Sequence, residues 1–476
     1  NIAAYQVAAT VLRDAWSTLE GPVSSILNQI LVGTSRESVG SSAEIADHVY
    51  SLIFELHRMA PALLNAVIPS ICLQLQVEEE DVRLRAAMLL GQLFASSHAE
   101  YGVEFTRSFK EYLGRSNDIS ANIRLEVVNS FGFIVQNKPA LRKHIEGPLV
   151  QRLRDPDERL RQAALTRLID FASAAPGSLL LETYTEMAEK VKDKRPEVRR
   201  LAMVGLARIY NRHVSQHLPA LNSVTAEGSG AAATYLRESI DSDVLERLQI
   251  IPGVLLQCWG YPEMSTRHLV IHLLQEVLLP KITNDIDDRR ASALLLIFEG
   301  LSISERNALA AVLNFKAKAR VELQAFLKIR SAPVRTSRNS DAISRSSKHM
   351  KSLRKCMLKL IQTIPAVDKK ASYFENIYAN KDRTVFRLLE SCVSPSDSIA
   401  QSLQNREDLK QRLVSKSALG EYMGMVFDVT SHMTANAGLV RSLLTYLEGV
   451  SISPDASACS DLLVLIAKYS AQAFQS

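Results

Sequence analysis

The sequence predicts an all-α protein whose helix pairs stack into an elongated, curved α-solenoid, an α-α superhelix. Its 476 residues include only 19 glycines and 16 prolines, too few for the turns of a large β-protein or the fingerprints of a glycine-rich nucleotide-binding fold. Hydrophobic residues make up 47% of the chain, which is enough for an extensive core. A sequence pattern also recurs about every 40 residues, as expected when one helix pair is repeated.

The first helix pair is expected at Ala43–Met59 and Pro61–Leu75. Proline suits the first turn of a helix, because the N–H that it lacks would have no partner inside the helix there. Pro61 therefore marks the start of the second helix of this pair.

Four segments then share one pattern: an acidic or polar turn, an aliphatic residue, an arginine, and small or aliphatic residues at helical spacing. Their arginines lie 41, 37 and 38 residues apart, close to the ~40–47 residues of HEAT or armadillo helix pairs. A lone pair cannot bury both of its faces, so the units must stack, and we predict a HEAT-repeat solenoid. The segments are Glu80–Phe94, Asp118–Val135, Asp155–Phe171 and Asp193–Tyr210, and the arginines are Arg83, Arg124, Arg161 and Arg199.

Two polar stretches divide the rest of the chain. We assign 1–212 to HEAT repeats, 213–234 to a flexible loop, 235–330 to HEAT repeats, 331–347 to a Ser/Arg-rich loop and 348–476 to HEAT-like helical repeats. The chain opens on Asn1 inside a helical pattern, so we expect a middle fragment of a longer protein. Helices are expected at Leu245–Gln257, Ser265–Leu279 and Asp288–Leu301, and at about 304–329, 345–363, 367–379, 382–393, 396–413, 417–433 and 435–449.

No catalytic, cofactor or metal site is expected. Gly228-Ser229-Gly230 lies in a low-complexity loop without a preceding strand, so it is not a phosphate loop. His213 and His217 could share a helix face, but no third metal ligand is near. The five cysteines are widely spread and are expected to be buried free thiols. No apolar run approaches the ~18–20 residues that span a bilayer, so no membrane partner is expected.

Basic side chains at the repeat turns allow two interpretations. They could line up along one edge of the solenoid as a basic track, or each repeat arginine could pair with an aspartate of the adjacent repeat. For the repeat arginines we favour the second, an Arg–Asp ladder joining Arg124 or Arg161 with Asp118, Asp155 or Asp193, because the guanidinium fork suits bidentate pairs. Four residues are extra to the pattern and form the predicted basic track: Lys192, Lys194, Arg195 and Arg200.

Aromatic residues occur at a turn between two predicted helices, in Cys258-Trp259-Gly260-Tyr261-Pro262. Tryptophan and tyrosine dominate the energetics of many interfaces, so Trp259 and Tyr261 could anchor a partner peptide. Trp259 could equally fill the core between two repeats. Arg289 and Arg290 lie at the start of the next helix pair and could bind carboxylates of the same peptide.

The range Lys316–Lys355 holds twelve Lys or Arg residues and two acidic ones, about +10 in a chain of net charge +5. This basic segment could contact duplex DNA or an acidic partner. The alternative that we favour is a solvated helix face followed by a basic loop.

Two motifs resemble one known family. Tyr112-Leu113-Gly114-Arg115-Ser116-Asn117-Asp118-Ile119, followed by Ile123-Arg124-Leu125-Glu126, is similar to the signature of sister-chromatid cohesion regulators of the "precocious dissociation of sisters" type. So is Asp193-Lys194-Arg195, followed by Val198-Arg199 and by Gly205-Leu206-Ala207-Arg208-Ile209-Tyr210. The resemblance implies a HEAT solenoid bound to the kleisin subunit of cohesin. It also implies cooperation with the releasing factor Wapl and with acetylation of the cohesin ATPase head.

By the same resemblance, the kleisin contacts would lie in the helices after the first loop, at Trp259, Tyr261, Arg289 and Arg290. The leading hypothesis is thus a non-catalytic scaffold on chromosomes in the nucleus, which maintains or releases cohesion. The alternatives are a HEAT-repeat nuclear transport receptor or phosphatase scaffold, or a helical scaffold that binds DNA through Lys316–Lys355.

Overall fold

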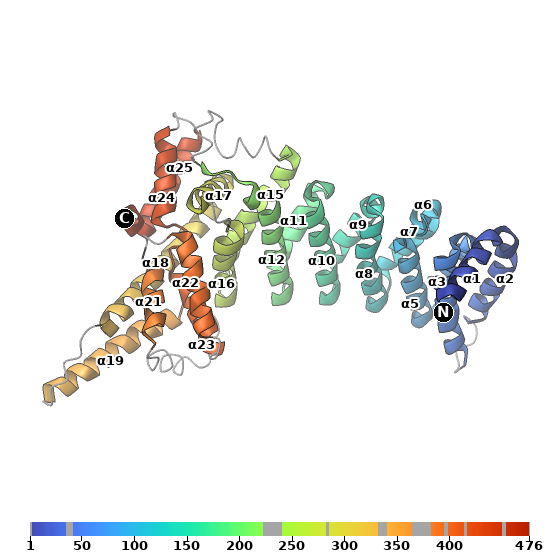
Figure 1. The fold of residues 1–476 in the computed structure, drawn as a ribbon, viewed down its shortest axis with the longest axis horizontal. Coiled ribbons are helices and arrows are strands. Elements are labelled where there is room, and N and C mark those ends of the chain that lie inside the picture. Colours follow the sequence, from blue (N-terminus) through green and yellow to red (C-terminus); the bar gives the residue numbers. More distant parts are fainter. Residues whose placement is uncertain are drawn as a thin grey trace. The chain divides into compact units, whose positions relative to one another are not determined.

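The computed structural model describes residues 2–34, 41–221, 240–281, 285–331, 340–363, 382–394, 398–413, 417–449 and 454–475. Within these ranges the chain is built from helices joined by turns, without a strand, which confirms the predicted all-α class (Figure 1). It divides into two compact units, Asn1–Ala202 and Met203–Ser476, and helix α12 (Pro196–His213) contains the boundary. None of the described helices combines the length and apolarity that crossing a bilayer demands.

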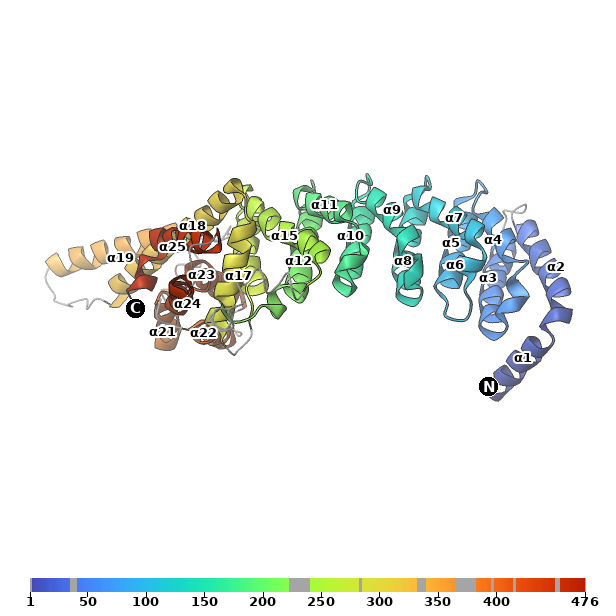
Figure 2. The same cartoon turned by 90° about the horizontal axis from the view of Figure 1, so that it is seen from above.

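The first unit consists of short helices that pack in sequence order. Helices α5, α8 and α10 stand side by side in both views, and α5 contacts α8, which contacts α10 (Figures 1 and 2). Each is followed by shorter helices that cross to the next one. The helices are α1 (Ile2–Asp14), α2 (Trp16–Thr34), α3 (Ser41–Met59), α4 (Ile68–Gln74), α5 (Glu80–Ala95), α6 (Tyr101–Glu104), α7 (Thr106–Gly114), α8 (Ala121–Asn137), α9 (Arg142–Arg152), α10 (Glu158–Ala174) and α11 (Leu181–Glu189).

Small residues and caps explain this spacing. A Cβ on Gly91 of α5 would lie only 2.6 Å from Oγ of Ser130 on α8, so glycine lets these two helices approach closely. Helix α8 begins where the Ser120 side chain accepts a hydrogen bond from the N–H of Asn122. Asp157 caps α10 in the same way, at the N–H of Arg159. Local sequence therefore sets the start of α8 and of α10 and allows the close approach of α5 and α8.

The second unit is organised around one 29-residue helix, α18 (Ile303–Ser331), which contacts α15, α19, α21, α23 and α25. Its other helices within the described residues are α15 (Ser242–Gln257), α16 (Met264–Leu273), α17 (Ile286–Gly300), α19 (Ser340–Ile361), α21 (Arg383–Cys392), α22 (Ile399–Arg412), α23 (Ser417–Thr430), α24 (Ala437–Gly449) and α25 (Pro454–Ser470). A π-helical turn, η8 (Leu274–Leu278), ends α16.

The predicted loops fall largely outside the described residues. Residues 222–239 and 332–339 are not described, nor is the helix expected at 367–379. Helix α19 begins at Ser340, inside the range assigned to the Ser/Arg-rich loop, and α12 ends at His213, where the first loop was expected to begin. The domain boundaries themselves stay a prediction.

Candidate partner-binding surfaces

The repeat arginines form the predicted ladder with aspartates of the next repeat. Arg83 Nε and Nη2 lie 3.2 and 3.3 Å from the carboxylate oxygens of Asp118. Arg124 binds Asp155 at 3.0 and 3.0 Å. Arg161 completes the third pair. All three rungs are bidentate and buried or nearly so, which confirms the predicted Arg–Asp ladder.

Each rung also closes the turn beside it. The Nη1 atom of Arg161 donates to the carbonyl oxygens of Asp155 and Pro156 at 3.0 and 3.1 Å, and Arg199 makes the same contact with Asp193 and Lys194. Burial opposes ionisation of Asp193, but hydrogen bonds from Arg161 and from the backbone N–H of Arg195 outweigh it and lower the pKa of this carboxyl group. The repeat arginines thus hold the stack together.

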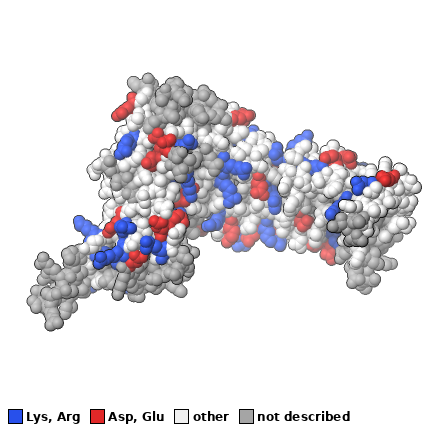
Figure 3. Space-filling view, in the orientation of Figure 1, with Lys and Arg blue, Asp and Glu red and all other residues white. Residues whose placement is uncertain are grey.

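The predicted basic track lies at the surface of the turn before α12. Lys192 pairs with Glu189 at 2.8 Å, and Arg195 pairs with Glu158 at 2.7 Å. Lys194 and Arg200 are exposed and make no ion pair within the described residues. On the face of the first unit seen in Figure 3, basic and acidic side chains are interspersed, so no unbroken stripe of one charge is present there.

Trp259 packs partly against its own chain and is partly exposed, so its surroundings agree with both a core residue and an anchor for a partner peptide. It lies in the short turn Cys258–Gly260 after α15 and is half-buried. Its ring contacts Phe315 of α18 edge-on, with centroids 5.2 Å apart, and the guanidinium carbon of Arg267 lies 5.5 Å from the ring centroid. Arg267 also donates to the carbonyl oxygens of Trp259 and Tyr261 at 3.2 and 2.9 Å. The turn is therefore rigidly held while part of the indole and of Tyr261 stays accessible.

Arg289 and Arg290 have different roles, although they are adjacent. Arg290 is 0% exposed, and its guanidinium donates to the carbonyl oxygens of Pro280, Gln275 and Met433 at 2.9, 2.9 and 2.6 Å. As positioned, it cannot accept a partner's carboxylate, because both terminal nitrogens bind the chain itself. This corrects the expectation that both arginines contact the partner. Arg289 is half-buried and donates to Leu218 at 2.9 Å.

The basic segment Lys316–Lys355 is also divided. Lys316 is 1% exposed and donates to the Asp428 carbonyl at 2.6 Å and to the Gln275 side chain, and Arg320 is buried too. Desolvation lowers the pKa of Lys316 well below its ordinary value. These two residues cannot contact DNA. Among the residues of this segment whose side chains the structure describes, the exposed cations are Lys318, Lys328, Lys348, Lys351, Arg354 and Lys355.

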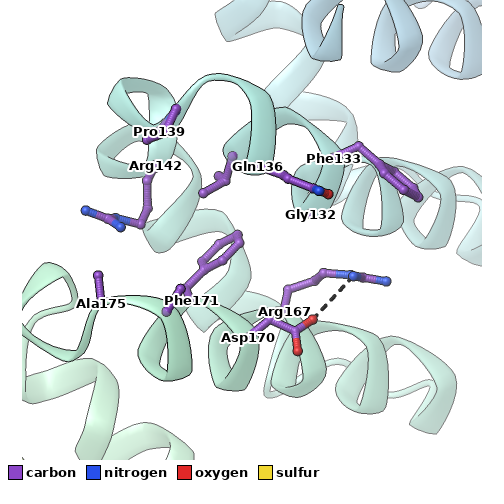
Figure 4. A pocket seen from close by; sticks show the side chains of 11 residues that line it. Gly132, Phe133, Gln136, Pro139, Arg142, Arg167, Asp170, Phe171 and Ala175 are labelled. Atoms are coloured by element: carbon purple, nitrogen blue, oxygen red, sulfur yellow. Dashed lines mark hydrogen bonds and ion pairs between the residues drawn. The ribbon is translucent and has the colours of Figure 1, made fainter. Parts of the chain in front are cut away.

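Sequence reasoning missed a groove between α8 and α10. It has a volume of about 540 Å³ and is lined mainly by apolar side chains. Figure 4 shows the ring of Phe171 pointing into it, with Arg142 on one side of this ring and the Arg167–Asp170 pair on the other. We call it the α8–α10 groove; its lining is Gly132, Phe133, Val135, Gln136, Pro139, Arg142, Arg167, Asp170, Phe171, Ala174 and Ala175. No motif marks it, because it arises only when two repeats stack.

The described residues contain no group of three or more His, Cys, Asp or Glu side chains that could hold a metal ion. Ser96 Oγ lies between two histidines, 2.6 Å from His57 Nε2 and 3.2 Å from His98 Nδ1, but His57 is fully buried and its other nitrogen lies 3.3 Å from the Tyr101 hydroxyl. This arrangement packs α3 against the turn after α5.

Comparisons with known proteins agree with this fold. The family model described as "PDS5: Sister chromatid cohesion protein PDS5 protein" matches residues 1–476. The protein named "Sister chromatid cohesion protein PDS5 homolog A" from Danio rerio is 31% identical over 217 residues, which are 46% of this chain and 16% of the relative. Its namesake from Homo sapiens is 23% identical over 481 residues, 98% of this chain and 33% of the relative.

A solved structure has the same fold. It is described as "Structure of the Pds5-Scc1 complex and implications for cohesin function", and the match has a TM-score of 0.78 at 18% identity over 98% of this chain and 65% of that one. At this identity the similarity supports the solenoid fold. The present chain spans about a third of the length of the curated relatives that match nearly all of it.

Proposed function

Because the chain belongs to the PDS5 family of sister chromatid cohesion proteins, we propose that it is a non-catalytic regulatory scaffold of cohesin that binds the kleisin subunit. The family match over residues 1–476 carries this proposal. The solved relative with the same fold is described in complex with Scc1, which supports a protein partner held on the solenoid.

We place the kleisin contact at the turn that presents Trp259 and Tyr261, with Arg289 as a further contact. Phe315 and Arg267 fix the indole of Trp259 in one orientation, so little side-chain entropy would be lost on binding. Arg290 is left out of the contact set. Its role is to position the start of α17 by binding three carbonyl groups.

The test is the affinity of a peptide from the N-terminal helical region of the kleisin, measured by isothermal titration calorimetry. Trp259→Ala should weaken binding by about 2 kcal/mol or more, as expected for an aromatic hot spot, and Trp259→Phe should restore part of it. The matched control is Trp16→Ala, which removes the other tryptophan of the chain, itself 41% exposed. Equal affinity of the wild type and Trp259→Ala would remove this turn from the binding site.

The cation contact is tested separately. Arg289→Glu should weaken the same peptide, because it places a negative charge where a carboxylate would bind. Arg107→Glu is the control, since the Arg107 side chain is 94% exposed and lies in the other unit. An equal loss with both variants would reveal a non-specific charge effect and would contradict a site at Arg289.

We propose that the basic track contributes a second, weaker contact with acidic residues of the partner. Lys194 and Arg200 are the members best placed for it, because Lys192 and Arg195 already pair with glutamates. The double variant Lys194→Glu/Arg200→Glu should slow association at low salt, with little effect at 0.5 M salt, in surface plasmon resonance. An unchanged association rate at low salt would exclude the track.

We further propose that the scaffold cooperates with Wapl and with acetylation of cohesin in maintaining or releasing cohesion, on chromosomes in the nucleus. Family membership supports this proposal. Co-purification of Wapl with the tagged chain, compared between cells with and without cohesin acetylation, provides the test. Equal recovery of Wapl in both would contradict cooperation, as would a tagged chain that stays out of the chromatin fraction.

Duplex DNA is a second candidate partner, because helix α19 presents Lys348, Lys351, Arg354 and Lys355 at its surface. These positions recur at helical spacing. Binding of a 20-base-pair duplex should fall steeply with salt, and Lys351→Glu/Lys355→Glu should reduce the salt slope by about two. Binding that is absent, or insensitive to salt, would dismiss DNA.

A further inference from the structure

We infer that the α8–α10 groove docks a short linear segment of a partner protein that carries an aromatic side chain next to an acidic residue. The groove lies within the first unit and includes no residue of the basic track, whereas the main kleisin contacts proposed above, Trp259, Tyr261 and Arg289, lie within the second. The α8–α10 groove would therefore hold a segment other than the kleisin segment bound at Trp259, which goes beyond the proposed function.

The apolar part of the groove fits an aromatic ring. Its volume of about 540 Å³ exceeds the size of one side chain, and its floor is formed by the ring of Phe171, which is 6% exposed. Phe133 at its edge is 60% exposed, an unusual state for phenylalanine in the middle of a helix. A ring placed between these two residues would bury apolar surface on both sides and could stack in the edge-on geometry that aromatic pairs prefer.

The charged part of the groove favours an acidic residue in the bound segment. Two arginines line it, against the single carboxylate of Asp170. Nη1 of Arg167 lies 3.4 Å from Oδ2 of Asp170, and the buried Nε of Arg167 has no hydrogen-bond acceptor. Arg142 makes no ion pair within the described residues. A carboxylate from the partner would balance this excess positive charge and could bind Arg142 through two parallel hydrogen bonds.

Gly132 leaves the space in which the Arg167 side chain lies at one side of the groove. A Cβ at this position would lie 2.7 Å from Nη1 of Arg167, so a larger residue would displace the guanidinium. Glycine therefore lets Arg167 of α10 lie across α8 and close one side of the groove. The Arg167–Asp170 pair then forms a fixed polar edge beside the aromatic floor (Figure 4).

The experiment uses a phage-displayed library of random 16-residue peptides, selected on the immobilised 476-residue chain. The expected result is an enriched motif in which an aromatic residue stands within three positions of Asp or Glu. The best peptide is then synthesised with a fluorescent label, and its affinity is measured by anisotropy for the wild type and for groove variants.

Phe133→Asp and Arg142→Glu should each weaken this peptide at least tenfold. Their matched controls are Ile119→Asp, an 89% exposed apolar residue of the same unit, and Lys143→Glu, the exposed cation next to Arg142; neither lines the groove, and both should leave the affinity unchanged. Replacing the acidic residue of the peptide by lysine should restore binding to Arg142→Glu. This charge swap separates a direct contact from a folding defect.

Three results would overturn the inference: no peptide enriched above background, enriched peptides without the aromatic–acidic pair, or peptides that bind the groove variants as tightly as the wild type. The kleisin peptide keeps this test distinct from the proposed function, because its binding should survive Phe133→Asp. Loss of both peptides with Phe133→Asp would indicate misfolding, and the charge swap at Arg142 would then decide alone.

Discussion

The guanidinium of Arg161 binds the carboxylate of Asp193 through two parallel hydrogen bonds, Nε to Oδ2 at 2.8 Å and Nη2 to Oδ1 at 2.9 Å. The two side chains are 4% and 5% exposed. Asp193 also accepts the N–H of Arg195, at the turn that leads into α12. One ion pair therefore fixes α10 against the next turn of the solenoid, and the same geometry recurs in two earlier rungs.

Removing one partner of this pair should be costly. Arg161→Ala leaves the Asp193 carboxylate buried without its main counter-charge and frees two carbonyl groups, so we expect a loss of about 3–5 kcal/mol in the free energy of unfolding. Chemical denaturation monitored by circular dichroism measures it. Arg159→Ala, which removes an exposed arginine two residues away, is the control and should leave the free energy of unfolding nearly unchanged. Similar losses for both would contradict the ladder as a source of stability.

The stability of the first unit should decrease in mild acid because of His57. Burial, together with the charge of His98, lowers the pKa of His57 from 6.5 to about 4. The unfolded chain therefore takes up this proton first, so the free energy of unfolding declines as the pH falls from 6.5 to about 4, and the contribution levels off below that. His57→Gln should be less stable at pH 7.5, yet should lose less stability over that interval. A variant with the same pH dependence as the wild type would contradict this role.

Arg289 and Arg290 should separate binding from folding. Arg290→Ala leaves buried carbonyl groups without donors, so we expect at least about 3 kcal/mol of destabilisation. Arg289→Ala loses one hydrogen bond, to Leu218, and should cost about 1 kcal/mol. Thermal unfolding of the two variants measures the difference. A more damaging Arg289→Ala would mean that the two roles are assigned the wrong way round.

Close packing at the start of α24 gives a steric prediction. A Cβ on Gly438 would lie 2.1 Å from Oδ2 of Asp287, whose other oxygen accepts a hydrogen bond from Asn436. Gly438→Ala should therefore destabilise the second unit by about 1–3 kcal/mol. Gly300→Ala is the control, because nothing lies within 4 Å of its Cβ position. Wild-type stability for Gly438→Ala would show that α17 and α24 have room to separate.

The ladder was predictable from sequence because it depends on a repeated spacing. Arginines about 40 residues apart, each six residues after the first residue of its turn, can be recognised without coordinates, as Arg124 with Asp118 and Arg161 with Asp155 illustrate. The starts of α8 and α10 were predictable for a similar reason, since the local caps Ser120 and Asp157 fix them.

The burial of Arg290 could not be predicted from a repeated spacing in the sequence. In Asp287-Asp288-Arg289-Arg290 the two arginines look equivalent, and only the packing of α17 against its neighbours separates them. One signal was present: Arg290 stands four and seven residues before Leu294 and Ile297, both buried, so it begins a core-facing row. Lys316 shows the same limit, because a charge count treats a buried lysine as a surface one.

The α8–α10 groove could not be predicted from the sequence, for a different reason. Phe133 and Phe171 belong to different repeats, and each fits an ordinary helical pattern. The space between them depends on the distance between two helices, which is set by packing along the whole stack.

Hydrogen–deuterium exchange of the 476-residue chain, with and without the N-terminal helical segment of the kleisin, tests the central claim most directly. A scaffold that binds this segment at the turn after α15 should show slower exchange at Cys258–Tyr261 and at the start of α17, and this protection should disappear in Trp259→Ala. Unchanged exchange at both places, with saturating kleisin segment present, would contradict the account.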